Sequence, residues 1–356
     1  MKEKHLFSNR DLGKLLIPVM LEQLLNSLMG MVDTMMVSTV GAVAISAVSL
    51  VDSINILAVQ AFSALAAGGT ILCSQYIGSG DKSKAKKAAS QVVLSVTALS
   101  VIVMTILLLL RVPLLHLIFG EVEDAVMKNS QTYFWYTVLS YPFIALYNCG
   151  AAVFRAQKNT RTPMLISVTS NCLNVAGNAF LIYVVGMGVK GAALATLFSR
   201  IFSAVTVMWF LRNPVCEVPV RDYHRIRPEW DYIRRVFKIG IPSGVENSMF
   251  QLGKLTIQST VSMLGTVAIA AQAMTNMLEL LNGILAMGIG MGMMTVIGQC
   301  IGAKKQEEAI YYIKKLTVWA EIIMIINCLA VLILTKPITL GRNKFFWLSE
   351  RKDHKM

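Results

Sequence analysis

Residues 14–22, KLLIPVMLE, return later in the chain as residues 238–246, KIGIPSGVE. Lysine, isoleucine, proline and glutamate keep their places in both copies, and the two prolines are 242 − 18 = 224 residues apart. The same offset relates two further pairs of stretches, GAVAI (41–45) with GTVAI (265–269) and QYIG (75–78) with QCIG (299–302). A register that holds without a gap this far indicates an internal repeat of large period.

The composition around this repeat is that of a membrane protein. Of the 356 residues, 55% are hydrophobic and 15% are charged, whereas soluble domains carry roughly 25% charged residues. The net charge of +13 would suggest nucleic acid in a soluble chain, but no basic stripe is interleaved with aromatic residues, so we expect no nucleic-acid partner. Apolar runs of about 20 residues recur along the whole length, which predicts an all-α polytopic membrane protein.

Nine stretches are apolar enough to form membrane-spanning helices. They lie near residues 15–38, 44–73, 88–111, 131–153, 163–186, 190–211, 236–262, 268–300 and 314–335. Lys and Arg gather before the first span and in every second connection, including Lys82, Lys84, Lys86, Lys87, Arg155, Lys158 and Arg161. By the positive-inside rule we expect a multi-pass protein of the cell membrane with a cytoplasmic N-terminus.

Six spans separate the two copies of the repeat, so both copies have the same orientation in the membrane. This predicts two lobes related by an axis along the membrane normal, and transporters of this kind place their sites near mid-membrane. We expect a six-helix N-lobe over 1–212, a cytoplasmic loop over 213–235, a partial three-helix C-lobe over 236–335 and a basic tail over 336–356.

Several motifs resemble the multidrug and toxic compound extrusion (MATE) family, and the resemblance runs from about Asp11 to Leu340. The motifs are IPVMLEQLLNSLMGMVDTMMVSTVG (17–41), SQYIGSGDKSKA (74–85), GQCIGAKKQEEA (298–309), FRAQKNTRTPM (154–164) and GVKGAALAT (188–196). The resemblance implies a MATE-like bundle of two lobes. It also implies an antiporter that exports organic, often cationic, drugs in exchange for H⁺ or Na⁺.

Polar residues inside the spans indicate where a cation could bind. A carboxylate at mid-bilayer costs roughly 2.5–3.5 kcal/mol on insertion scales, so it is a functional hypothesis by default. Glu22, Asn26 and Asp33 fall within about 40° of one another on a helix. Span five has three asparagines on one shared face, Asn171, Asn174 and Asn178. Spans four and six add the neutral oxygens of Asn148 and Thr196, respectively. Such oxygens suit Na⁺, or a proton on Asp33, while hydrogen-bonded helix packing is the structural alternative.

In the family, the aspartate of span one and polar groups of spans four to six form the cation site of the N-lobe. The resemblance places this site at Asp33, Asn148, Asn174, Asn178 and Thr196, with Na⁺ held by Asp33, Asn174, Asn178 and Thr196. Some branches carry an aspartate at the position of Asn178, so tight Na⁺ binding is in question. No cofactor beyond the coupling ion and no other metal is expected.

Glu22, Asn26, Asn171 and Glu246 are secondary candidates. Glu246 is the repeat mate of Glu22, but family branches that use a glutamate in span seven place it where this chain has Phe250. Four further charges lie inside the spans, and we expect mutual ion pairing at the lobe interfaces for most of them; they are Asp52, Arg200, Lys254 and Glu279.

The repeat predicts that the second lobe should reach at least residue 212 + 224 = 436, and the chain has 356 residues. We therefore expect that a frameshift, a premature stop or an assembly error shortened a twelve-span gene. The predicted function is cation-coupled export of organic drugs or toxins by a monomer that contacts membrane lipids and is not an enzyme. A non-transporting remnant and a flippase for lipid-linked sugars are the alternatives.

Overall fold

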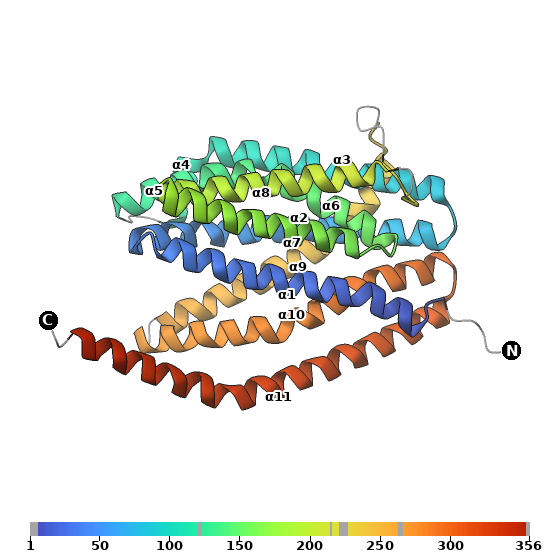
Figure 1. The fold of residues 1–356 in the computed structure, drawn as a ribbon. Helices are drawn as coiled ribbons and strands as arrows, with labels where there is room; N and C mark the ends of the chain where they lie inside the picture. Colours follow the sequence, from blue (N-terminus) through green and yellow to red (C-terminus); the bar gives the residue numbers. More distant parts are fainter. Residues whose placement is uncertain (1–5, 120–122, 214–215, 221–226, 263–265, 354–356) are drawn as a thin grey trace.

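The computed structural model describes residues 6–119, 123–213, 216–220, 227–262 and 266–353. Within these ranges, the side chains of 255, 258–259, 262, 266–271, 273–274, 276–278, 280–281 and 334–353 lie outside the description. The described chain forms helices and no strand (Figure 1). They are α1 (Asn9–Ser38), α2 (Ala42–Gly78), α3 (Lys82–Leu109), α4 (Arg111–Phe119), α5 (Asp124–Leu139), α6 (Tyr141–Ala156), α7 (Arg161–Ala179) with the π-helical η1 (Phe180–Val184), α8 (Gly188–Leu211), α9 (Trp230–Ser262), α10 (Thr266–Gly302) and α11 (Gln306–Asp353).

Local chemistry explains where several of these helices begin. At the start of α1, the Ser8 hydroxyl accepts a hydrogen bond from the Asp11 N–H, and the Asp11 carboxylate accepts one from the Ser8 N–H, which is a capping box. The Asp81 carboxylate accepts from the Lys84 N–H at 2.9 Å and caps α3. Helices α5 and α6 meet at a bend of 40°, beside Pro142, which has no N–H to continue the hydrogen-bond ladder.

Most of the predicted spans coincide with helices able to cross a membrane. By length and apolar composition, seven helices in the described part of the chain qualify, and the bent pair α5 and α6 makes up to eight. The remaining predicted span, 236–262, is helical but does not qualify, because polar residues such as Glu246 and Lys254 dilute the apolar run of α9. Helix α9 also begins at Trp230, inside the stretch predicted as a loop.

The six predicted spans of the N-lobe correspond to α1–α8, and the three predicted spans that follow correspond to α9–α11, which we call the C-lobe (Figure 1). Helices α9–α11 repeat α1–α3, including the turn between the last two. Gly80 and Lys304 are 304 − 80 = 224 residues apart, and both have positive φ, 78° and 60° respectively. Only glycine adopts this backbone freely, so the repeat preserves the turn geometry even where lysine has replaced glycine.

Each lobe packs its first helix against the second helix of the other lobe. Gly68 of α2 lies so close to α9 that an added Cβ would be 3.1 Å from the Gly240 nitrogen, and Gly292 of α10 is similarly close to Leu16 of α1. Because 240 − 224 = 16 and 292 − 224 = 68, these two contacts are copies of one another. The interface between the lobes therefore follows the repeat as a pseudo-twofold pair.

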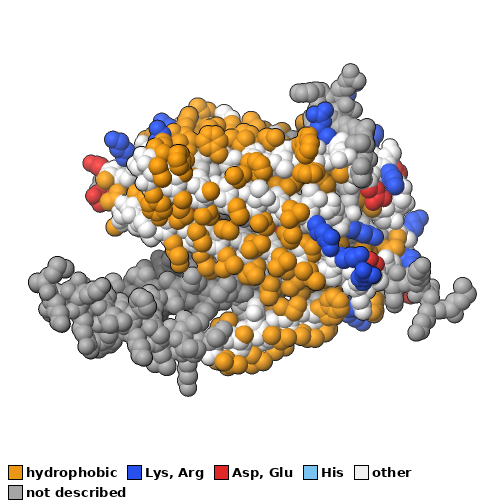
Figure 2. All heavy atoms as spheres, viewed as in Figure 1, with side chains coloured by type: hydrophobic (Ala, Val, Ile, Leu, Met, Phe, Trp, Pro, Cys, Tyr) orange, Lys and Arg blue, Asp and Glu red, His pale blue; other side chains and the backbone are white. Residues whose placement is uncertain are grey.

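The flanks of the molecule expose many large apolar side chains. Figure 2 shows hydrophobic side chains along the flank, while Lys and Arg gather mainly at the end that holds the N-terminus. Exposed examples are Leu109, Leu117, Val184, Phe198 and Trp209. A continuous apolar surface of this kind suits a lipid environment, where the helices satisfy their own backbone groups.

Candidate cation site and central cavities

A polar cavity of about 370 Å³ lies between α1, α2, α6, α7 and α8 of the N-lobe, and Met291 of α10 also lines it. We call it the N-lobe cavity. The predicted site residues that line it are Glu22, Asn26, Asp33, Asn148, Asn171, Asn174 and Thr196. The polar stripe of α1 and the asparagines of α7 therefore face one another across a common space.

Asp33 is linked to α7 and α8 by a chain of hydrogen bonds. The Asn178 Nδ2 donates to Asp33 Oδ1, and at 3.3 Å to Asn174 Oδ1. The Asn174 Nδ2 in turn donates to Thr196 Oγ1 at 3.3 Å. Among the residues that the structure describes, no Lys, Arg or His nitrogen lies within 4 Å of the Asp33 carboxylate. Asp33 is thus a half-buried carboxylate with an amide partner and no salt bridge.

The oxygen atoms around Asp33 suit a small cation. Asn178 is fully buried, and its Oδ1 has no hydrogen-bond partner in the described part of the protein. A buried amide oxygen without a partner is uncommon in native structures. A hard cation would coordinate such an oxygen together with the Asp33 carboxylate and the Thr196 hydroxyl. The donor set fits Na⁺ on these grounds, and a proton could bind Asp33 without it.

Asn26 forms a second link between α1 and α7, nearer the N-terminal end of α1. Its Oδ1 accepts hydrogen bonds from the Ser167 hydroxyl at 2.7 Å and from Asn171 Nδ2 at 2.6 Å. Asn148 lines the same cavity from α6. Two polar contacts, at Asn26 and Asp33, therefore fasten the C-terminal half of α1 to α7.

Glu22 lines the same cavity but, unlike Asp33, it forms an ion pair. Its two carboxylate oxygens accept from Arg155 Nη2 at 3.0 and 3.1 Å, and the Tyr147 hydroxyl donates to it at 2.9 Å. The Glu22 side chain is 1% exposed, so this is a buried ion pair. The sequence analysis assigned Arg155 to a cytoplasmic loop, which is wrong, since Arg155 lies in the last turn of α6. No spacing in the sequence connects positions 22 and 155.

Two larger spaces lie between the lobes. The cleft, of about 770 Å³, is lined by α2, α9 and α10. The central cavity, of about 640 Å³, lies between the same helices and α6. Glu246 lines the central cavity and not the N-lobe cavity, so the structure does not bring it to Asp33.

The three spaces share lining residues and form a series. Lys254 and Glu279 line both the cleft and the central cavity. Asn148 and Arg155 line both the central cavity and the N-lobe cavity. A path of neighbouring cavities therefore runs from the cleft towards Asp33.

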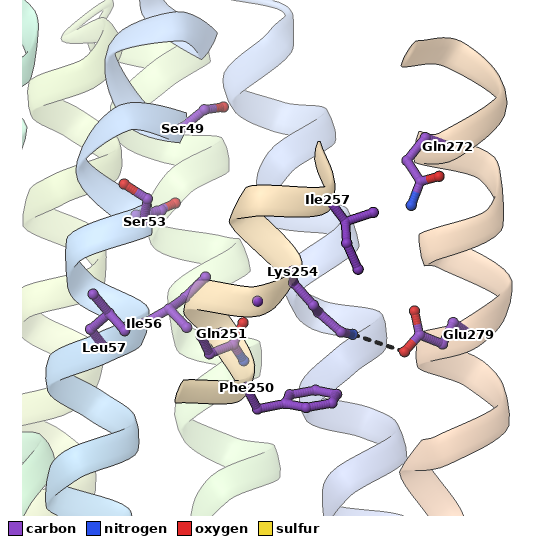
Figure 3. A pocket seen from close by; sticks show the side chains of 12 residues that line it. Ser49, Ser53, Ile56, Leu57, Phe250, Gln251, Lys254, Ile257, Gln272 and Glu279 are labelled. Atoms are coloured by element: carbon purple, nitrogen blue, oxygen red, sulfur yellow. Dashed lines mark ion pairs between the residues drawn. The ribbon is translucent and has the colours of Figure 1, made fainter. Parts of the chain in front are cut away.

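Four further charges were expected to pair with one another, and two of them do. Lys254 Nζ lies 2.9 Å from Glu279 Oε1 (Figure 3). Asp52 accepts a hydrogen bond from Asn55 at 3.1 Å, and Arg200 donates to the Ser140 hydroxyl at 2.6 Å. Lys254 and Glu279 therefore form the expected ion pair, whereas in the described part of the chain Asp52 and Arg200 make hydrogen bonds to neutral side chains and no ion pair within 4 Å.

The protein has two repeat-related helical lobes, with polar cavities inside and between them. This architecture is typical of multi-pass membrane transporters built from internal repeats. The sequence profile of the MatE family matches residues 18–180 and 242–341, and the chain belongs to this transporter family.

Comparison with individual proteins agrees with this assignment. The chain is 26% identical to "Uncharacterized transporter YisQ" of Bacillus subtilis, over 85% of this chain and 67% of that protein. It is 26% identical to "Probable multidrug resistance protein NorM" of Thermotoga maritima, over 86% and 66%. A solved structure, "Crystal structure of MATE in the bent conformation", superposes with a TM-score of 0.81 at 21% identity, over 91% and 71%. The chain thus spans about two thirds of the length of these curated relatives.

Proposed function

We propose that this protein exports organic compounds, organic cations among them, across the cell membrane in exchange for H⁺ or Na⁺. The observation that carries the proposal is the Asp33 carboxylate, which has no salt bridge and faces a cavity next to the space between the lobes. The Thermotoga maritima relative is named a probable multidrug resistance protein, which supports export as the activity. The basic residues at the N-terminal end support a cytoplasmic N-terminus.

In this mechanism the coupling ion binds to Asp33, with oxygens of Asn174, Asn178 and Thr196 completing the site for Na⁺. Binding neutralises the Asp33 carboxylate and so changes its hydrogen bond to Asn178. Because that bond fastens α1 to α7, ion binding changes how α1 packs and hence the access to the central cavity. When one coupling cation enters for each neutral substrate molecule that leaves, a potential of 100 mV contributes about 2.3 kcal/mol, enough for roughly fifty-fold accumulation of that substrate outside. Exchange for a monovalent organic cation moves no net charge and is driven by the concentration gradient of the coupling ion.

The test is ethidium export in everted membrane vesicles, with Na⁺ and pH gradients imposed separately. We expect Asp33→Asn to lower ion-driven export by about tenfold or more, because ion and substrate binding are no longer coupled. Asp124→Asn, at the exposed start of α5, is the matched control and should transport as the unmodified chain does.

Full ion-driven export by Asp33→Asn would contradict the proposal. Export that depends on a lipid-linked sugar and ignores drugs would favour a flippase. A chain that inserts but moves neither kind of substrate would be a non-transporting protein.

A further inference from the structure

The Lys254 ammonium occupies a position between an aromatic ring and a carboxylate. Its Nζ lies 2.9 Å from Glu279 Oε1 and 5.1 Å from the centroid of the Phe250 ring. Figure 3 shows Lys254 extending from α9 towards Glu279 on α10, with the Phe250 ring beside it. A carboxylate and an aromatic face are the two groups that bind organic ammonium ions best in proteins.

This position lies where two cavities meet. Phe250, Lys254 and Glu279 line both the cleft and the central cavity. A compound that passes from one space to the other must therefore pass these side chains. The Asp33 site lies beyond, in the N-lobe cavity, so the two sites are separate.

The contacts of Lys254 are accessible and weak. The Lys254 and Glu279 side chains are 44% and 53% exposed, and Phe250 is 61% exposed. Exposed ion pairs of this kind contribute little to stability. An incoming cation can therefore reach the ring and the carboxylate and replace the lysine there without disrupting the fold.

The wall of the cleft favours a cation with an apolar body over an anion. Among the described residues that line it, Asp52 and Glu279 carry negative charge and Lys254 carries the positive charge. Ile56, Leu57 and Ile257 add apolar surface. An anion would have to separate Lys254 from Glu279 and would then face two carboxylates.

We propose that Phe250 and Glu279 form a binding site for the ammonium group of hydrophobic organic cations, and that Lys254 is a built-in competitor for it. The inference rests on the proposed function, because it names the substrate class that the cleft admits. Lys254 then determines specificity. It blocks cations that bind Phe250 and Glu279 less well than its own ammonium does, and it yields to those that bind better.

The experiment measures binding of the cationic dye rhodamine 6G to the purified chain in detergent, by fluorescence anisotropy and without any ion gradient. Lys254→Met should tighten dye binding by about three- to tenfold, since the site is then no longer partly occupied by the lysine. Lys254→Arg keeps the charge and should bind as the unmodified chain does. Glu279→Gln added to Lys254→Met should abolish the gain, and Lys128→Met, at an exposed position of α5, is the control for lysine removal.

Unchanged or weaker rhodamine binding by Lys254→Met, in a variant that elutes normally from size exclusion, would overturn the inference. So would loss of binding of the anionic dye calcein on the same substitution, because Lys254 would then serve an anion. Asp33→Asn should bind rhodamine normally. If the Lys254 and Glu279 variants change rhodamine binding as expected but export does not depend on an ion gradient, the proposed ion coupling is wrong and this binding site still stands.

Discussion

Two carboxylates on one side of α1 have opposite surroundings. Glu22 is fully buried against Arg155 and Tyr147, whereas Asp33 is half-buried against an amide. Removing one partner of a buried ion pair is more damaging than replacing both, because it leaves a charge without compensation in a poorly solvated site. Glu22 therefore stabilises the junction of α1 and α6, while Asp33, which has no ion pair in the described part of the chain, is the carboxylate that we propose binds the coupling cation.

Arg155 compensates the buried charge of Glu22. Arg155→Met should lower the free energy of unfolding by about 3–5 kcal/mol, because Glu22 is left buried and charged. Adding Glu22→Gln to Arg155→Met should recover most of the loss. Thermal unfolding of the detergent-purified protein, followed by tryptophan fluorescence, measures both effects. Arg161→Met, at an exposed position, is the control, and a double variant no more stable than Arg155→Met would contradict the interpretation.

At the scale of elements, the crossing of α2 and α10 depends on two glycines that are repeat mates. An added Cβ on Gly78 would overlap the Gln299 carbonyl oxygen, and one on Gly302 would overlap the Gln75 carbonyl oxygen. Since 78 + 224 = 302 and 75 + 224 = 299, a single contact occurs twice around the pseudo-twofold axis. Small residues at such a crossing allow the two backbones to touch, which is a common basis of helix association in membranes.

Adding a methyl group to either glycine should destabilise this crossing. Gly78→Ala should lower the free energy of unfolding by about 1–3 kcal/mol, because the methyl group overpacks the crossing. Gly302→Ala should do the same, and the double variant should cost less than the sum, since both changes separate one pair of helices. Gly30→Ala adds a methyl group with no atom within 4 Å and should leave stability unchanged or higher. Equal effects of Gly30→Ala and Gly78→Ala would argue against close packing as the cause.

At the scale of the whole molecule, α1 belongs to both lobes. Its first half packs on the C-lobe, where Leu12 and Leu16 share a core with Ile289 and Leu316. Its second half is fastened to α7 of the N-lobe. A change at Asp33 therefore acts on a helix that both lobes hold. The close glycine contacts lie near the cytoplasmic ends predicted for the spans, and the residues that line the cleft lie nearer the other ends. We therefore predict that the cleft is reached from the outside.

This arrangement predicts which side of the membrane reaches the cleft. In a variant whose six cysteines are replaced, Ser49→Cys in the cleft should react with a membrane-impermeant maleimide added to intact cells. Ser83→Cys, exposed at the start of α3, should react only after the membrane is permeabilised. The two positions are matched in exposure, and the reverse labelling pattern would show that the N-terminus is outside.

Some of the site was predictable because it depends on spacing within one helix. Glu22, Asn26 and Asp33 share a face of α1 through the 100° turn per residue, and the structure places all three along one cavity. The partners of these side chains were not predictable. Arg155 was placed in a loop, and Asp52 and Arg200 were expected in ion pairs that the described residues do not form. Which side chains meet depends on how neighbouring helices rotate against each other, and sequence spacing carries no information on that rotation.

The apolar spans, the 224-residue repeat and the polar stripe of α1 can be read from the sequence alone, because each follows from composition or from periodicity along the chain. The packing of the helices determines that α1 contacts both lobes, that Glu22 has an ion pair where the described residues give Asp33 none, and that Lys254 lies between Phe250 and Glu279. These features arise where separate helices touch, and the packing of the whole bundle determines which residues meet there.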